Sequence, residues 1–142
     1  MDDNLRQEIK EHIKEHEGFS KLAYECPHGF ITIAWGRNLE TKGINKDEAE
    51  ILLDNDVNDC IADLKRVIKN FDNMPGKAQL VLIDLVYNMG LSKLLGFENF
   101  LDSLECGKYE EAAEHLLDSK YARQLKRRSR INASYIISCS EE

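Results

Sequence analysis

The segment that most limits the fold is residues 79 to 89, QLVLIDLVYNM, which is apolar on nearly every face of a helix. A helix of this kind is stable in water only when other elements surround it. Amphipathic helical patterns flank it, at residues 46 to 71, 97 to 104, 109 to 117 and 119 to 137. A chain of 142 residues is long enough to bury a core of this size. The sequence therefore predicts a helical unit built around one buried helix.

A different pattern occupies the first 44 residues. Apolar residues four positions apart predict an amphipathic helix that ends at Gly18. The sequence Pro27-His28-Gly29 predicts a turn, and FITIAW directly after it predicts a strand. Asn45 and Glu48 have the spacing of a capping box, which predicts the start of a long helix there.

Strands gathered at one end of a largely helical chain define the α+β class. We predict one domain with two lobes: a small sheet lobe over residues 18–44 and a helical lobe over residues 76–142. The helix of residues 45–71 joins the lobes, and the N-terminal helix of residues 3–17 belongs with the helical lobe. A long helix between two lobes leaves a cleft, which is where ligands usually bind.

Glu17 and Thr32 are the first candidates for chemistry. Glu17 closes the first helix, where the helix dipole disfavours a carboxylate and is expected to raise its pKa toward that of a general acid. In the strand, alternation puts Ile31, Ile33 and Trp35 on one face, which suits a core. Thr32 then lies on the other, roomier face, where its hydroxyl can hold a water.

Charge and cysteine usage exclude several classes of function. A net charge of −7 argues against binding to nucleic acid or to anionic membranes. Residues 126 to 130, KRRSR, are locally basic and form either a solvated helix face or an electropositive wall. The four cysteines are widely spaced and are expected to be reduced thiols. His12 and His16 lie four apart, but the zincin glutamate is missing, so we expect no metal and no cofactor.

The segment from Glu17 to Gly36 carries a recognisable motif. Its pattern, E-G-x4-A-Y-x-C-P-x-G-x2-T-I-x-x-G, resembles the catalytic signature of phage-type lysozymes, the endolysin and muramidase family of T-even and lambdoid phages. Glu17, Cys26 and Thr32 have the family's spacing, in the branch that carries Cys at the middle position. Residues 44–57, 82–90 and 96–117 and the sequence QLKRRSRI resemble later segments of the family, in the same order.

The resemblance implies hydrolysis of the β-1,4 bond between N-acetylmuramic acid and N-acetylglucosamine in peptidoglycan. Glu17 would give a proton to the glycosidic oxygen, while Cys26 and Thr32 position or activate a water. This is the inverting arrangement, in which the two groups stand about 6.5–9.5 Å apart. Either Arg127 or Arg128 would pair with Glu17. Cys26 would activate water through a lowered pKa, with His28 as one possible cause, or act as a spacer or a nucleophile.

The resemblance also implies the residues that bind the glycan. These are Asn38, Tyr87 and Asn88, with Phe100 and His115 near further subsites, although both belong to amphipathic helices whose residues often serve packing. Ala34-Trp35-Gly36-Arg37 departs from the family's usual G-Y-G-H, so a histidine that lines the cleft is missing. Glu25 is the competing carboxylate, which strand alternation directs away from Cys26.

The family further implies a monomer that acts on the peptidoglycan glycan strand, with no nucleic-acid partner and no stable membrane association. The polar N-terminus has no apolar signal core, so we expect synthesis in the host cytoplasm and release to the wall through a holin-type pore. The alternative is a catalytically weak or silent module of lysozyme fold that binds the wall.

Overall fold

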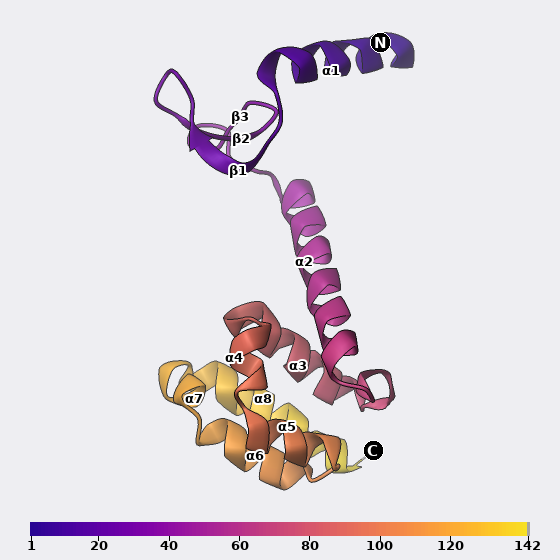
Figure 1. Cartoon of the computed structure of the whole chain (residues 1–142), viewed down its shortest axis with the longest axis vertical. Coiled ribbons are helices and arrows are strands. Elements are labelled where there is room, and N and C mark those ends of the chain that lie inside the picture. Colours follow the sequence, from indigo (N-terminus) through magenta and orange to yellow (C-terminus); the bar gives the residue numbers. More distant parts are fainter. Residues whose placement is uncertain (142) are drawn as a thin grey trace. The chain divides into compact units, whose positions relative to one another are not determined.

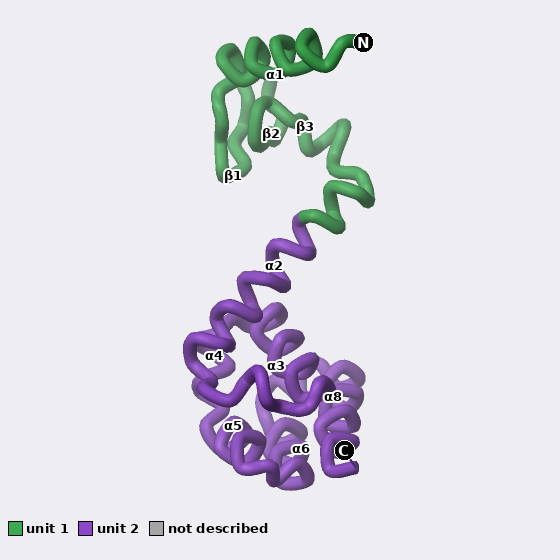
Figure 2. The backbone as a smooth tube through the Cα atoms, turned by 90° about the vertical axis from the view of Figure 1, so that its right-hand side faces the viewer, with its two compact units in different colours: residues 1–51 green, residues 52–142 purple. Residues whose placement is uncertain are grey.

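A computed structural model describes residues 1 to 141, which divide into two compact units, one of residues 1–51 and one that begins at Leu52 (Figure 2). Three antiparallel strands lie in the first unit and most of the helices in the second (Figure 1), so the predicted α+β class is confirmed. Contacts group the N-terminal helix with the sheet. Its assignment to the helical lobe, like the lobe boundaries, stays a prediction. No helix in residues 1 to 141 has the length and apolarity to cross a bilayer.

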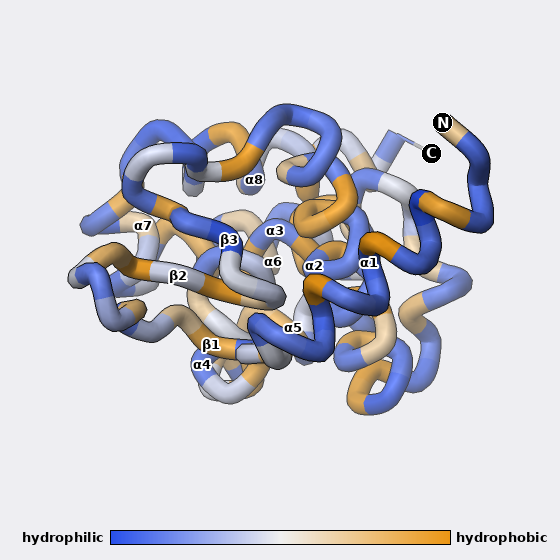
Figure 3. The backbone as a smooth tube through the Cα atoms, turned by 90° about the horizontal axis from the view of Figure 1, so that it is seen from above, coloured by the Kyte–Doolittle hydropathy of each residue, from blue (hydrophilic) through white to orange (hydrophobic). Residues whose placement is uncertain are grey.

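The first unit begins with α1 (Asp3–Glu17), which Asp2 caps by accepting a hydrogen bond from the Asn4 amide at 3.1 Å. The helix ends because Gly18 takes a φ of +71°, which a residue with a Cβ adopts only at a cost. Hydrophobic and hydrophilic stretches alternate along α1 (Figure 3). The large apolar side chains of this helix are exposed within the unit.

The sheet has the order β1–β2–β3 and is antiparallel throughout. Strand β1 (Ser20–Glu25) turns at Pro27 into β2 (Ile31–Ala34), as predicted, and β3 is only two residues long (Arg37–Asn38). The expected burial of the two faces of β2 is wrong within this unit. Ile31 and Trp35 are exposed, whereas Thr32 is 4% exposed and donates its hydroxyl to the Phe30 carbonyl at 3.0 Å.

The long helix α2 (Lys46–Val67) starts where the sequence predicts. The Glu48 amide donates to Asn45 Oδ1 at 2.9 Å, and the Asn45 amide donates to Glu48 Oε1 at 3.0 Å. These two bonds confirm the capping box and satisfy two amides that the helix itself leaves without partners.

The second unit holds the hydrophobic core of the described chain. Its centre is α3 (Gly76–Met89), the helix that the sequence predicted to be buried, and Val81, Leu82 and Leu85 expose none of their surface. Around it lie α4 (Leu91–Leu95), α5 (Glu98–Glu105), α6 (Tyr109–Leu117), α7 (Lys120–Gln124) and α8 (Lys126–Ser138), together with the short 3-10 turns η1 (Phe71–Asn73) and η2 (Cys139–Glu141).

The last helical segment differs from its prediction as one helix. The helix is interrupted at Leu125, whose φ of −124° and ψ of 65° lie outside the helical region. The segment therefore forms two separate helices, α7 and α8. Periodicity of apolar residues does not detect such a break, because the pattern continues through a single non-helical residue.

Candidate active site

Glu17 is positioned by the meeting of α1 with the turn that joins β2 and β3. A Cβ placed on Gly36 would lie 2.7 Å from Glu17 Oε2 and 2.9 Å from its Cδ, so the carboxylate rests directly on the glycine backbone. Gly36 has a φ of +78°, and Ala34 in the same turn has a φ of +59°. Left-handed backbone is costly for alanine and clusters at functional sites. The turn is thus built to bring its backbone close to the carboxylate.

Cys26 and Thr32 meet at the turn between β1 and β2. The Cys26 amide donates to the Phe30 carbonyl at 2.9 Å, and the Gly29 amide donates to the Cys26 carbonyl at 2.8 Å. This tight loop brings the backbone of residues 28 to 30 around the thiol. Thr32 lies on the adjacent strand, paired with Tyr24, and interacts with the same sulfur.

The loop lowers the pKa of the Cys26 thiol. The largest cause is a hydrogen bond from the Phe30 backbone, and the backbones of His28 and Gly29 and the Thr32 side chain act in the same direction, against desolvation. The direction is the expected one, but His28 contributes through its backbone and not through its ring. Because amide dipoles favour the charged form, they raise the thiolate fraction at neutral pH.

The Thr32 hydroxyl has two competing acceptors. It lies 3.0 Å from the Phe30 carbonyl, to which it donates, and it also interacts with Cys26. One hydroxyl carries one hydrogen, so it donates to the carbonyl when Cys26 is a thiol and can turn to the sulfur when Cys26 is a thiolate. Cys26 and Thr32 therefore form a coupled pair.

Asn38 has a local structural role. Its side-chain oxygen accepts hydrogen bonds from the amides of Glu40 at 2.9 Å and Thr41 at 3.0 Å. These bonds fold the loop after β3 and leave the side-chain NH2 group as the part of Asn38 that can meet a ligand. Its predicted role in substrate binding stays a prediction.

The other predicted binding residues belong to the second unit. Tyr87 and Asn88 are exposed near the end of α3, and Asn88 lines a cavity of about 530 Å³ with Tyr121 and Gln124. His115 is exposed on α6. Phe100 needs a correction: it is 2% exposed and packs in the hydrophobic core, so it has no surface with which to bind a glycan.

The two candidate arginines differ in their surroundings. Arg128 donates from Nε to Asp84 Oδ2 at 3.0 Å and from Nη2 to Asp84 Oδ1, so the pair is bidentate. The buried Asn132 donates to Asp84 at 2.8 Å and to the Tyr121 hydroxyl at 3.2 Å. Arg127 lines a shallow surface hollow. Pairing of Glu17 with Arg127 or Arg128 stays a prediction.

The Asp84 carboxylate was not anticipated from the sequence. Burial is the largest single influence and raises its pKa, but the bonds from Arg128 and Asn132 outweigh it, so the pKa lies below the usual value. An acidic residue within the otherwise apolar segment 79 to 89 was the available signal. Gly36 was also missed as a residue that positions Glu17, although a glycine just after a strand is a typical sign of a special turn.

Metal chemistry has no ready donor set in residues 1 to 141, where no three His, Cys, Asp or Glu side chains gather closely enough to hold an ion. The His12 and His16 rings lie with their centroids 4.3 Å apart and their planes tilted by 36°, and His16 Nδ1 lies 2.8 Å from the His12 carbonyl oxygen. The two histidines thus interact locally along α1.

A comparison with protein families matches residues 14–131 to the model of the phage lysozymes. The matched stretch contains Glu17, Cys26, Thr32 and Arg128 and covers most of the chain. The protein therefore belongs to the phage lysozyme family, whose members are glycoside hydrolases that degrade peptidoglycan.

Replacing Gly36 by alanine should move the Glu17 carboxylate. The new Cβ would meet Glu17 at 2.7 Å, closer than nonbonded atoms approach, in addition to a left-handed backbone penalty of about 1 kcal/mol. Because Glu17 is the predicted acid, we expect Gly36→Ala to lower kcat by about 10²-fold, as misplacement of a catalytic group does.

Gly107→Ala is the control for backbone strain. Gly107 has a φ of +74°, with no atom within 4 Å of its would-be Cβ, so it carries the backbone penalty without the clash. Melting temperatures should fall in both variants, while kcat should fall only in Gly36→Ala. Equal kcat values in the two variants would contradict the contact between Gly36 and Glu17.

Cys26 should react with iodoacetamide as a thiolate at unusually low pH. Because its folded pKa is lowered, the midpoint of the pH–rate curve should lie below the value of about 8.5 for free cysteine. Thr32→Val removes one donor to the sulfur and should raise the midpoint. Mass spectrometry of the modified peptides assigns the rate to Cys26. A midpoint that Thr32→Val leaves unchanged would argue against coupling of the two side chains.

Asp84→Asn should destabilise the protein at neutral pH and lose this effect in acid. A carboxyl whose pKa is lowered on folding stabilises the fold above its unfolded pKa, and the contribution is lost as pH falls through the folded pKa. Because the Arg128 side chain is 40% exposed, we expect a loss of only about 1 kcal/mol at pH 7.

Urea unfolding of wild type and Asp84→Asn at about pH 7 and pH 3 measures this loss. Asp72→Asn is the control, since Asp72 pairs with Lys65 at 3.4 Å on the exposed surface and should cost little at either pH. A difference between wild type and Asp84→Asn that stays constant with pH would contradict the role of the carboxylate.

Proposed function

We propose that the protein is an endo-β-1,4-N-acetylmuramidase that cleaves between N-acetylmuramic acid and N-acetylglucosamine. The observation that carries the proposal is the first unit itself. It holds Glu17 against the backbone of Gly36 in the turn between β2 and β3, and its turn between β1 and β2 carries a thiol of lowered pKa beside a hydroxyl. An inverting glycosidase needs a general acid and a general base that activates water, and the proposal gives the base role, usually that of a carboxylate, to Cys26.

In the proposed reaction Glu17 gives a proton to the glycosidic oxygen as the bond to the anomeric carbon breaks. A water attacks that carbon from the opposite face and loses a proton to the Cys26 thiolate, which the neighbouring Thr32 hydroxyl positions. The products are a free hydroxyl on N-acetylglucosamine and a reducing-end N-acetylmuramic acid of inverted configuration. The lowered pKa of Cys26 supports its role as a base, because a thiolate accepts this proton and a thiol does not.

The proposed biological role is lysis of a phage host. In this proposal the enzyme is a monomer that is made in the host cytoplasm, reaches the wall through a holin-type pore and cuts the glycan strand there. Asn38, Tyr87, Asn88 and His115 are proposed to contact the glycan, and Arg127 or Arg128 to pair with Glu17. Phe100 is left out of this set because it is buried.

Clearing of a peptidoglycan suspension tests the acid. Glu17→Gln should reduce kcat by about 10²–10⁴-fold, the usual contribution of a general acid. Glu25→Gln is the matched control, since Glu25 is an exposed carboxylate in the same hairpin and should be dispensable. Equal clearing by wild type and Glu17→Gln would contradict the acid role. Binding of the wall without clearing would favour the silent module.

The configuration of the products tests Cys26. NMR of the first products from a defined muropeptide should show inversion, and Cys26→Ser should slow the reaction without changing that outcome. Retention would contradict direct attack by water and point to a covalent thioglycoside on Cys26.

A further inference from the structure

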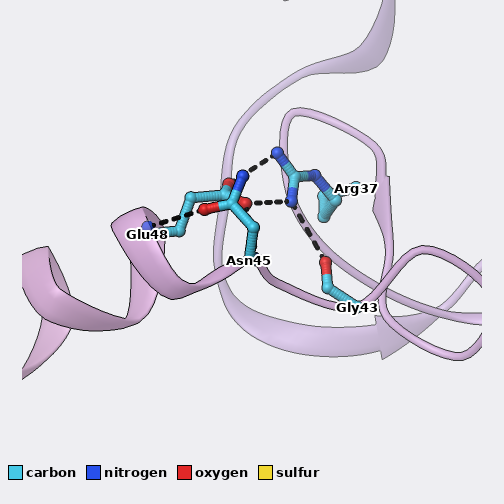
Figure 4. A network of polar contacts seen from close by, with 4 residues as sticks. All are labelled: Arg37, Gly43, Asn45 and Glu48. Atoms are coloured by element: carbon cyan, nitrogen blue, oxygen red, sulfur yellow. Dashed lines mark hydrogen bonds and ion pairs between the residues drawn. The ribbon is translucent and has the colours of Figure 1, made fainter.

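Arg37 follows directly after Gly36, the residue on which the Glu17 carboxylate rests. Its guanidinium makes three short contacts, all within the first unit (Figure 4). Nη1 donates to the Gly43 carbonyl at 3.1 Å and to Glu48 Oε1 at 3.0 Å, and Nη2 pairs with Glu48 Oε2 at 2.6 Å. The two-point contact with Glu48 uses the planar fork of arginine, which lysine cannot reproduce.

Glu48 serves two partners at once. The same carboxylate oxygen that accepts from Arg37 Nη1 also accepts from the Asn45 amide and completes the capping box of α2. The hydrogen bond from Arg37 is the main cause of a lowered pKa at Glu48, so the pair stays ionised at neutral pH. The turn after β2 is therefore fixed to the first turn of a long helix.

The turn needs such an anchor because little else in the unit holds it. Strand β3 is two residues long and pairs with β2 only through Thr32–Asn38 and Ile33–Arg37. In residues 1 to 51, all of which the structure describes, Thr32 is the one buried residue, so apolar packing within the unit does not fix the strand. Ala34 also holds left-handed backbone, which is strained for a residue with a Cβ and persists only where neighbouring contacts restrain it.

We propose that Arg37 is a positioning residue for Glu17, which it holds in place through the turn by its two-point bond to Glu48. The role rests on the proposed muramidase function. Arg37 does not touch the reacting atoms. It fixes the position of the Gly36 backbone next to the Glu17 carboxylate. It also keeps Asn38 paired with Thr32 in the register of the sheet.

The test compares Arg37→Met, Arg37→Lys and Glu48→Gln with Asn45→Ala. Glutamine still serves in a capping box, so Glu48→Gln weakens the clamp and spares the cap. Asn45→Ala removes the bond to the Glu48 amide and leaves the contacts of Arg37 with Glu48 in place. The effect of losing the helix cap alone is therefore measured in the control variant, Asn45→Ala.

We expect Arg37→Met to lower kcat by about tenfold to a hundredfold, as small misplacements of catalytic groups do, with KM changed less than about twofold. The kcat values of Arg37→Lys and Glu48→Gln should lie between those of Arg37→Met and wild type. Asn45→Ala should lower the melting temperature and keep kcat. Circular dichroism at the assay temperature identifies any variant that has unfolded, and the milder variants then decide.

Fluorescence gives a readout that needs no activity. Trp35 is the single tryptophan of the chain and precedes Gly36 in the turn. In Arg37→Met, quenching of Trp35 by acrylamide should increase by about twofold, as a freed and more mobile side chain becomes more accessible. Asn45→Ala should leave the quenching unchanged.

The outcomes separate this proposal from the function on which it rests. If Arg37→Met and Asn45→Ala lower kcat equally, or if Arg37→Met lowers only the melting temperature, the positioning role is overturned. If wild type fails to clear peptidoglycan, the proposed function fails, and the quenching of Trp35 still decides whether Arg37 holds the turn. Unchanged quenching in Arg37→Met would overturn the clamp in either case.

Discussion

The contact between the Glu17 carboxylate and the backbone of Gly36 is the constraint on which the site depends. Any side chain at position 36 would occupy the space of the carboxyl group, since its Cβ would lie 2.7 Å from Oε2. The left-handed turn and the end of α1 meet here, so the Glu17 carboxylate lies against bare backbone. Under the proposed function, a displaced turn would displace the acid, and small displacements of a catalytic group slow a reaction.

The turn between β1 and β2 of the same unit favours the thiolate form of Cys26. An aspartate is ionised at neutral pH without help, whereas a cysteine needs donors that favour its thiolate. The loop of residues 26 to 30 supplies those donors from its backbone, with the Phe30 amide the most important. Backbone amides keep their place when side chains change, so a tight turn is a sturdy way to lower the pKa of a thiol in an exposed hairpin.

Local sequence rules predicted the parts of the fold that neighbouring residues determine. The capping box of Asn45 and Glu48, the end of α1 at Gly18 and the buried helix around Leu82 follow from spacing and turn chemistry alone. The motif also named Cys26 and Thr32, which the structure brings together. The contacts that were missed join positions far apart in the sequence. Arg128 and Asp84 are separated by 44 residues, and Arg37 and Glu48 by 11. Periodicity carries no information about such pairs.

Glu48 shows why the missed contacts matter more than their number suggests. Within its own segment, Glu48 is one half of the capping box that starts α2. In three dimensions the same carboxylate binds Arg37 and so extends the rigidity of α2 to the turn under Glu17. The family's usual histidine at position 37 cannot offer two parallel donors to one carboxylate, whereas arginine can. The departure from the family pattern at Arg37 therefore gives this turn a two-point bond to Glu48 that a histidine could not make.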